Sequence, residues 1–267
     1  MTAKRTTFVA LLATILFVSP LLAQAPPKKE VAKTTASRVE KKTYDFKLAG
    51  KEMEYAQFVP SNYDKEKTFP LMVCLHGLFS NPQQIIRYKG LTDLAEKHGY
   101  VLVAPMGYNT TGWYGAKSPL GSGKTDPENL SELSEKDVMN VLGIARKEFN
   151  IDPDRIFLMG HSMGGGGTLH LAIKHPDIWA GLAPIAPAIY RPATDVAKIQ
   201  HIPVIVVQGA KDFLVPASGT RKWIDEMKKL DMKHQYIEDP NSDHTNVAIT
   251  YLPKIFEFFA TQKRNGK

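Results

Sequence analysis

One serine in this sequence stands where nucleophilic chemistry is expected. The residues Gly160-His161-Ser162-Met163-Gly164 fit the pattern Gly-x-Ser-x-Gly. The apolar run before them, residues 156–159, predicts a buried strand, and the apolar spacing after them predicts a helix. A sharp turn between strand and helix leaves the serine hydroxyl exposed above the sheet edge. The pattern therefore predicts that Ser162 is a nucleophile and that the amide of Met163 faces a developing oxyanion.

A serine hydroxyl needs a base beside it and an acid behind that base. Asp212 follows the apolar run 204–207, and His244 follows the shorter run 236–237. The carboxyl ends of parallel strands meet at one edge of a sheet, so we expect Ser162, Asp212 and His244 to converge there. A turn residue and a surface histidine are the plainer interpretations of the last two. Asp195 and Asp239 are weaker candidates for the catalytic acid, because neither directly follows a buried strand.

The order Ser162, Asp212, His244, together with the strand–turn–helix context, resembles that of the α/β-hydrolases. From about residue 42 onward the chain is similar to secreted serine esterases of the feruloyl esterase, acetyl xylan esterase and polyhydroxybutyrate depolymerase type. The resemblance implies a catalytic triad and an acyl-enzyme intermediate, with an acyl ester of a plant polysaccharide, a polyester or a small ester as substrate. It also implies that the amide of Leu78, after His76-Gly77, is the second oxyanion donor, and that no cofactor takes part.

Two other functions are consistent with such a fold. A serine peptidase of the prolyl oligopeptidase type looks similar, but that family usually carries an N-terminal propeller, for which this sequence has no room. A non-catalytic binding protein would usually show a broken triad. No metal or nucleotide site is expected, because the sequence lacks a His-Glu-x-x-His motif, a cysteine pair and a glycine loop with lysine. His170 and His175 are wrongly spaced to share a metal, and the side chain of His161 is expected to point away from the base.

The apolar runs 71–75, 101–104, 156–159 and 204–207 predict central strands that are buried on both faces. Helical patterns lie between them, which indicates a mostly parallel sheet with helices on both faces, in one α/β domain over residues 43–262. Residues 44–48 and 53–59 alternate as the strands of a hairpin. Ser134 and Asp137 have the spacing of a capping box, which would start a helix there.

Two features of the sequence are less easily interpreted. The long segment 106–130 follows a predicted strand, so we expect it to border the site, with Trp113 forming an apolar wall of the acyl or alcohol pocket. Packing of Trp113 in the core is the alternative, since tryptophan is highly buried on average. The run of glycines at 164–167 is costly in a helix. Close approach of the helix to the sheet explains one or two of these glycines, and nothing in the sequence explains all four.

The 267 residues carry a net charge of +7, of which Lys4 and Arg5 account for two. Residues 1–25 have the basic start, apolar run and small residues of a signal peptide, cleaved after Ala23 or Ala25. An uncleaved anchor is the alternative. Residues 26–42 are expected to be a disordered basic linker and 263–267 a basic tail, both solvated rather than bound to nucleic acid. With the single Cys74 in a strand, we expect no internal disulfide. The protein is thus expected to be a secreted or periplasmic monomer, without a stable membrane anchor after signal removal.

Overall fold

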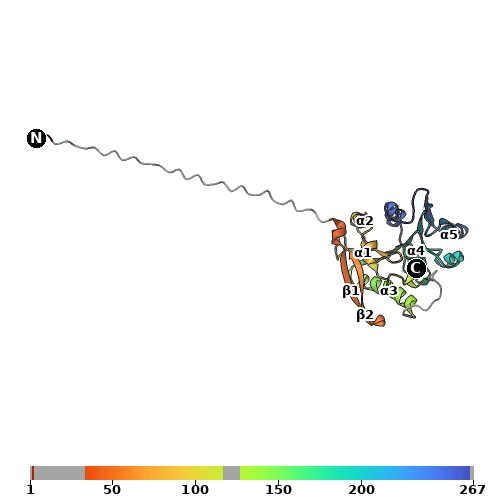
Figure 1. Cartoon of the computed structure of the whole chain (residues 1–267), viewed down its shortest axis with the longest axis horizontal. Coiled ribbons are helices and arrows are strands. Elements are labelled where there is room, and N and C mark those ends of the chain that lie inside the picture. The colour runs from red at the N-terminus through yellow and green to blue at the C-terminus, as the bar shows by residue number, and fades with distance from the viewer. Residues whose placement is uncertain (1, 3–33, 117–126, 265–267) are drawn as a thin grey trace. The chain divides into compact units, whose positions relative to one another are not determined.

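The computed structural model describes residues 2, 34–116 and 127–264 (Figure 1). Apart from residue 2, the predicted signal peptide lies outside the described residues, as do residues 26–33 of the predicted linker and residues 117–126. Contacts group residues Lys33–Lys267 into one compact unit. Among the described residues, no helix is both long enough and apolar enough to cross a membrane.

A single mixed sheet forms the centre of the described chain, in the strand order β1-β2-β4-β3-β5-β6-β7-β8. The pairs β1–β2 and β2–β4 are antiparallel, and all the others are parallel. The expected α/β architecture is therefore confirmed. The strands are β1 (Glu40–Phe46), β2 (Lys51–Phe58), β3 (Phe69–Leu75), β4 (Val101–Pro105), β5 (Ile151–His161), β6 (Gly181–Ile185), β7 (Val204–Gly209) and β8 (His234–Asp239).

Helices cover both faces of the sheet. Alternate residues of β3 belong to two separate cores: Leu71, Val73 and Leu75 face one, and Met72 and Cys74 the other. The first core includes residues of α3 (Leu130–Glu148), α4 (Met163–Lys174) and α5 (Ala217–Lys229). The second includes residues of α1 (Pro82–Ile85), α2 (Leu91–His98), α6 (Val247–Thr250) and α7 (Leu252–Ala260).

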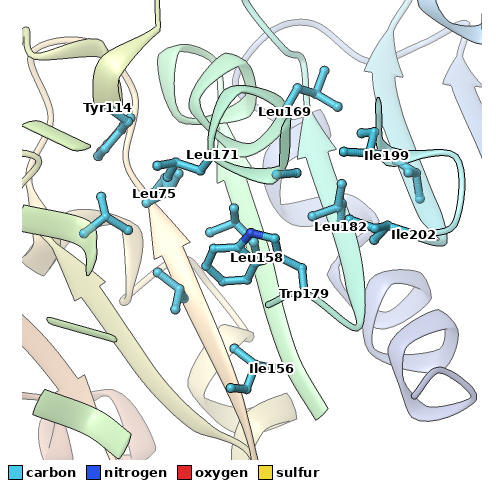
Figure 2. Close-up of a cluster of buried hydrophobic side chains, with 14 of the residues drawn as sticks. Leu75, Tyr114, Ile156, Leu158, Leu169, Leu171, Trp179, Leu182, Ile199 and Ile202 are labelled. Atoms are coloured by element: carbon cyan, nitrogen blue, oxygen red, sulfur yellow. The ribbon is translucent and has the colours of Figure 1, made fainter. Parts of the chain in front are cut away.

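The first core is centred on the strand that leads to Ser162. Figure 2 shows Trp179 beside Leu158 of β5, with Leu169 and Leu171 of α4 above them. Trp179 and Leu158 are at most 1% exposed. Burying side chains of this size contributes about 1.5–3 kcal/mol each. The apolar packing therefore fixes β5 and α4 against each other, and with them the turn between the two.

The ends of the predicted hairpin and linker need correction. The hairpin is present as β1 and β2, but β1 pairs with β2 from Glu40 onward, and a 3-10 turn occupies Thr35–Arg38. The Arg38 guanidinium donates to Glu96 (3.0 Å) and to the carbonyl of Val59 (2.6 Å). The prediction of disorder is thus wrong for residues 35–42. These residues are ordered because the basic side chain that suggested a solvated arm has acceptors on the domain.

The predicted basic tail also begins too early. Arg264 donates its backbone amide to the Asp154 carbonyl (2.9 Å), and its guanidinium lies 3.1 Å from the Asp154 carboxylate. Residue 264 therefore belongs to the folded domain, and residues 265–267 lie outside the described residues.

Two further elements differ from the expectations. Strand β6 was not predicted, because Gly181-Leu182-Ala183-Pro184-Ile185 lacks both alternation and β-branched residues apart from Ile185. The capping box is wrong as well, since α3 already begins at Leu130 and places Ser134 and Asp137 in its interior, both fully buried. Their side chains bond the loop before the helix instead of capping it.

Candidate active site

Ser162 lies at the junction of β5 and α4, with φ 59° and ψ −116°. A positive φ is unfavourable for a residue with a side chain and persists only where the surroundings enforce it. Here the Ser162 amide donates to the Ile185 carbonyl (2.9 Å), and the Ser162 carbonyl accepts from the amides of Gly166 (3.1 Å) and Ala188 (3.0 Å). Backbone bonds from β6 and from the segment after it thus hold the predicted sharp turn.

The two glycines of the motif are required by close contacts between backbones. A Cβ at position 160 would lie 2.2 Å from the Gly164 carbonyl oxygen, and a Cβ at 164 would lie 2.1 Å from the Leu75 carbonyl oxygen. Both distances are far inside van der Waals contact. The start of α4 therefore packs directly on the backbones of β3 and β5.

The next three glycines are explained in the same way. A Cβ at position 165 would lie 2.8 Å from the Ile185 carbonyl oxygen, and one at 166 would lie 2.1 Å from that of Ala188. At 167 the neighbour is the ring of Tyr114, at 2.6 Å. All four glycines of the run face atoms of other elements, which the sequence alone did not explain.

Asp212 and His244 are joined by a hydrogen bond of 2.7 Å between the carboxylate Oδ2 and the imidazole Nδ1. Asp212 is 4% exposed and lies just beyond the end of β7, as expected. Its Oδ1 accepts from the backbone amides of Leu214 (3.0 Å) and Val215 (2.8 Å). These donors orient the carboxylate, which leaves Oδ2 directed at the imidazole.

The weaker acid candidates have other partners. Asp195 pairs with Arg191 (2.7 Å) and Lys198 (3.0 Å), which lowers the pKa of its carboxyl. Asp239 accepts from the Ser242 hydroxyl and from the Asn241 amide. The structure therefore brings Asp212, and neither of these two, to His244.

The segment after β3 lies against Ser162. A Cβ at position 77 would be 3.4 Å from the Ser162 Cβ, so the backbone of Gly77 runs close to the serine. Leu78 follows it, half-buried at the edge of the site. Phe79 has φ 62° and donates its amide to the Thr110 carbonyl (2.9 Å), which fixes the loop beyond Leu78. Leu78 lines the same cavity as Ser162, and its role as the second oxyanion donor stays a prediction.

A cavity of about 590 Å³ opens above these residues. Ser162, His244, Leu78 and Trp113 all line it. Its other walls are formed by Gly77, Phe79, Ser80, Tyr88, His161, Ala188, Tyr190, Leu214, Val215 and Thr245. The rim is apolar and accessible, since Phe79 is 73% and Leu214 75% exposed.

Trp113 combines the two alternatives that the sequence left open. It is only 5% exposed and belongs to the first core, yet one side of it lines the cavity. Its ring meets that of Tyr190 edge-on, with centroids 5.6 Å apart at 73°. Tyr190 was not singled out from the sequence, and no motif around it points to the site.

The loop that carries Trp113 is held by the interior of α3. The Asp137 carboxylate accepts from the amides of Gly107 (2.6 Å) and Tyr108 (3.3 Å) and from the Tyr44 hydroxyl (2.5 Å). Ser134 accepts from the Tyr114 amide (2.9 Å) and donates to the Gly107 carbonyl (2.6 Å). Burial raises the pKa of the Asp137 carboxyl to about 6.

The expectation that His161 points away from the base is wrong. Its ring centroid lies 4.8 Å from that of His244, and its Nε2 is 2.9 Å from the His244 carbonyl oxygen. The side chain turns this way because its Nδ1 also finds the Tyr88 hydroxyl, at 2.9 Å. His161 lies inside the Gly-x-Ser-x-Gly motif, directly before Ser162, so the sequence already placed it beside the expected nucleophile.

The remaining pair of histidines, in α4 and at its C-terminal end, has a different role. His170 and His175 both bond Glu135, at 3.3 Å and 3.0 Å, and so connect α4 to α3. Within residues 34–116 and 127–264, no group of three or more His, Cys, Asp or Glu side chains is arranged to hold a metal ion.

The chain is similar in sequence to a known family and to several known proteins. Residues 47–246 match the family described as "Putative esterase". The S-formylglutathione hydrolase of Rattus norvegicus is 32% identical over 146 residues, which are 51% of this chain and 51% of that protein. The bifunctional acetylxylan esterase/xylanase XynS20E of Neocallimastix patriciarum is 27% identical over 201 residues, 72% of this chain and 27% of that protein.

Solved structures agree on the fold. The ferulic acid esterase AmCE1/Fae1A from Anaeromyces mucronatus superposes with a TM-score of 0.64 at 20% identity, over 84% of this chain and 90% of that one. The chain spans about half the length of the first relatives that it matches in sequence. The strand order and these neighbours establish the α/β-hydrolase fold. Because the family match covers most of the described domain, the chain belongs to the esterase family.

Proposed function

We propose that this protein is a serine carboxylesterase that works through an acyl-enzyme intermediate. The observation that carries the proposal is the convergence of three strand ends on one cavity. Ser162 after β5 and His244 after β8 both line it, and Asp212 after β7 bonds His244 from behind at 2.7 Å. This is the arrangement that activates a serine hydroxyl.

In the proposed reaction, the Ser162 hydroxyl attacks the ester carbonyl carbon while His244 takes its proton. The amides of Leu78 and Met163 donate to the oxygen of the tetrahedral intermediate. Collapse of the intermediate breaks the bond to the alcohol, which leaves with the proton from His244. Water then attacks the acyl-enzyme in the same manner, and the proton returns to Ser162. Asp212 holds the imidazole in the productive tautomer throughout.

The cavity supports an ester with an apolar or aromatic part. Trp113 and Tyr190 present ring surfaces on one side, and Phe79 and Leu214 are exposed at the rim. Burial of the apolar part of an ester against such surfaces favours binding. Relatives and neighbours named acetylxylan esterase and ferulic acid esterase support an acylated plant polysaccharide as substrate. Poly(3-hydroxyalkanoate) depolymerase C and S-formylglutathione hydrolase support a polyester or a small ester.

The proposal is tested with purified protein on p-nitrophenyl acyl esters, acetylated and feruloylated xylan fragments and proline-containing peptide amides. We expect turnover of esters, and we expect Ser162→Ala to reduce kcat by several orders of magnitude with an unchanged melting temperature. Near-normal ester turnover by the folded variant would exclude the mechanism. Preferential cleavage of the peptide amides would favour a peptidase of the prolyl oligopeptidase type.

We further propose that the protein is exported, on the basis of the signal-like residues 1–25. Mass spectrometry of the active protein recovered outside the cytoplasm should find an N-terminus at Gln24 or Pro26. An intact Met1 in that protein would contradict the proposal.

A further inference from the structure

The base of the proposed triad contacts a second histidine. The His161 ring is 7% exposed and lies against the imidazole of His244, with 4.8 Å between centroids and 37° between planes. Its Nε2 is 2.9 Å from the backbone carbonyl oxygen of His244. His244 therefore meets two other elements through hydrogen bonds: Asp212 at its side chain and His161 at its backbone.

The hydrogen-bond partners of the two ring nitrogens determine which nitrogen of His161 carries the proton. A neutral imidazole has one N–H donor and one acceptor. The Tyr88 hydroxyl lies 2.9 Å from Nδ1, and burial raises the pKa of Tyr88 to about 12, so the hydroxyl keeps its proton. The His244 carbonyl oxygen can only accept, so the proton of the neutral ring lies on Nε2, which donates to that carbonyl, and the Tyr88 hydroxyl donates to Nδ1. Burial and the nearby charge of His244 lower the pKa of His161 to about 4, so the ring stays neutral.

The loop of His244 is otherwise bonded to itself and to the segment after β7, where the Lys211 amide donates to the Ser242 carbonyl (3.0 Å). Asp243 accepts from the amides of Thr245 and Asn246, both at 2.9 Å, and its own amide donates to the Asn246 side chain at 2.9 Å. These bonds shape the loop but do not attach it to the strand of the nucleophile. The bond from His161 does, because His161 is the last residue of β5 and immediately precedes Ser162.

We propose that His161 is a positioning residue for His244: its Nε2–H holds the His244 backbone and its ring supports the His244 imidazole, so that base and nucleophile keep a fixed separation. This rests on the proposed function. A displacement of about 1 Å between reacting groups can cost about 100-fold in rate. Since His244 acts in both acylation and deacylation, loss of the support slows both steps together and leaves KM nearly unchanged.

Two amide substitutions test the role of Nε2. In His161→Gln, the side-chain amide nitrogen reaches the place of Nε2 and can still donate to the His244 carbonyl. In His161→Asn, the shorter side chain places its amide near Nδ1, and the bond to His244 is lost. With p-nitrophenyl acetate we expect His161→Asn to lower kcat about 10- to 100-fold and His161→Gln to stay within about 3-fold of wild type, with KM similar in all three.

Tyr88→Phe removes only the hydroxyl that supports this tautomer by donating to Nδ1. We expect kcat to fall about 3- to 10-fold, and we expect the double variant with His161→Asn to fall no further than His161→Asn alone, because both changes act through one bond. The matched control is His175→Gln, a histidine that bonds Glu135 and does not line the cavity. This control should leave kcat and KM unchanged.

Melting temperatures are measured for every variant, and Ser162→Ala is assayed beside them. If Ser162→Ala stays active, the proposed function fails. If Ser162→Ala is inactive while folded His161→Asn and His161→Gln have equal kcat, or if the loss in His161→Asn appears only in KM, the positioning role is overturned. Should His161→Asn fail to fold, the tautomer step is decided by Tyr88→Phe, for which wild-type kcat overturns the inference.

Discussion

The two sides of the cavity are built by different kinds of contact. At the side of Ser162, backbone packs on backbone: α4 approaches β3 so closely that a Cβ at position 164 would lie 2.1 Å from the Leu75 carbonyl oxygen. At the side of Trp113, an irregular loop is held by polar side chains of α3, Ser134 and Asp137. The Ser162 side is thus held by glycines that let backbones pack closely, whereas the Trp113 side is held by the buried polar side chains of Ser134 and Asp137.

This difference predicts how each side responds to change. Contacts between backbones cannot be relieved by a different rotamer, so the backbone packing at the Ser162 side should tolerate almost no substitution and should not change with pH. Buried polar contacts depend on protonation and on the exact acceptor present. The Trp113 side should therefore respond to pH. Substitutions at this side should change the substrate preference more than the rate of the chemical step.

The largest effect is expected at the acid behind the base. Asp212→Asn should lower kcat about 10⁴-fold, because the amide favours the wrong tautomer of His244. The folded protein should persist, since the amide oxygen can still accept from the Leu214 and Val215 amides. Asparagine replacements of Asp195, Asp239 and Asp243 are the controls in the same ester assay. A greater loss in any of these three would assign the acid elsewhere.

The next effect tests the backbone packing at the Ser162 side. Gly164→Ala should cost more than about 3 kcal/mol in the free energy of unfolding, because the added methyl overlaps the backbone of β3. Gly143→Ala is the matched control, since a Cβ at position 143 of α3 meets nothing within 4 Å. Urea unfolding should show this control to be stabilised by about 0.5–1 kcal/mol. Equal stabilities of the two variants would contradict the packing argument.

Trp113→Ala should show both of its roles. Because Trp113 is 5% exposed, we expect a loss of about 3 kcal/mol in the free energy of unfolding. Because it also lines the cavity, kcat/KM should fall unequally for short-chain, long-chain and aromatic acyl esters. Trp179→Phe, in the core beneath β5, is the control that should lower stability alone. An unchanged ranking of esters in Trp113→Ala would assign the side chain to the core only.

The smallest effect is the pH dependence at Asp137. Burial raises the pKa of its carboxyl from 3.8 to about 6 in the folded protein. A raised carboxyl pKa gives a contribution to stability that is full below pH 3.8 and is lost as pH rises through 6. When the pH is lowered from 7.5 to 4.5, the free energy of unfolding of wild type should therefore rise by about 2 kcal/mol relative to that of Asp137→Asn, as measured by urea unfolding. A difference between the two proteins that does not change with pH would contradict this.

The sequence allowed the elements with a local pattern to be predicted. The strand cores 71–75, 101–104, 156–159 and 204–207 lie within β3, β4, β5 and β7, because continuous apolar runs are typical of strands buried on both faces. Because Asp212 follows such a strand and His244 follows the shorter apolar run 236–237, the approach of the two residues could be predicted. The prediction depended only on the rule that parallel strands end at one edge.

The remaining features depend on contacts between distant residues. Ser134 and Asp137 have capping spacing, but they bond Gly107, Tyr108 and Tyr114, some 20 to 30 positions away in the sequence. The glycine run appeared excessive until its neighbours in β3, in β6 and in the Tyr114 loop were known. His161 was misplaced because alternation along a strand gives the face of a side chain but not the partner that turns its ring. These are tertiary contacts that no local pattern encodes.

The four consecutive glycines of α4 limit where substitutions could change the substrate specificity of the enzyme. Positions 164–167 have no room for any other residue, so diversity introduced there would yield mostly unfolded chains. The rim is different, because its residues Phe79, Tyr190 and Leu214 are between 44% and 75% exposed. A randomised library confined to those rim positions, with residues 160–167 kept constant, would reshape the entrance while leaving the scaffold intact. Residues 160–167 would thus have to be kept unchanged in any variant, whereas the rim positions could be redesigned.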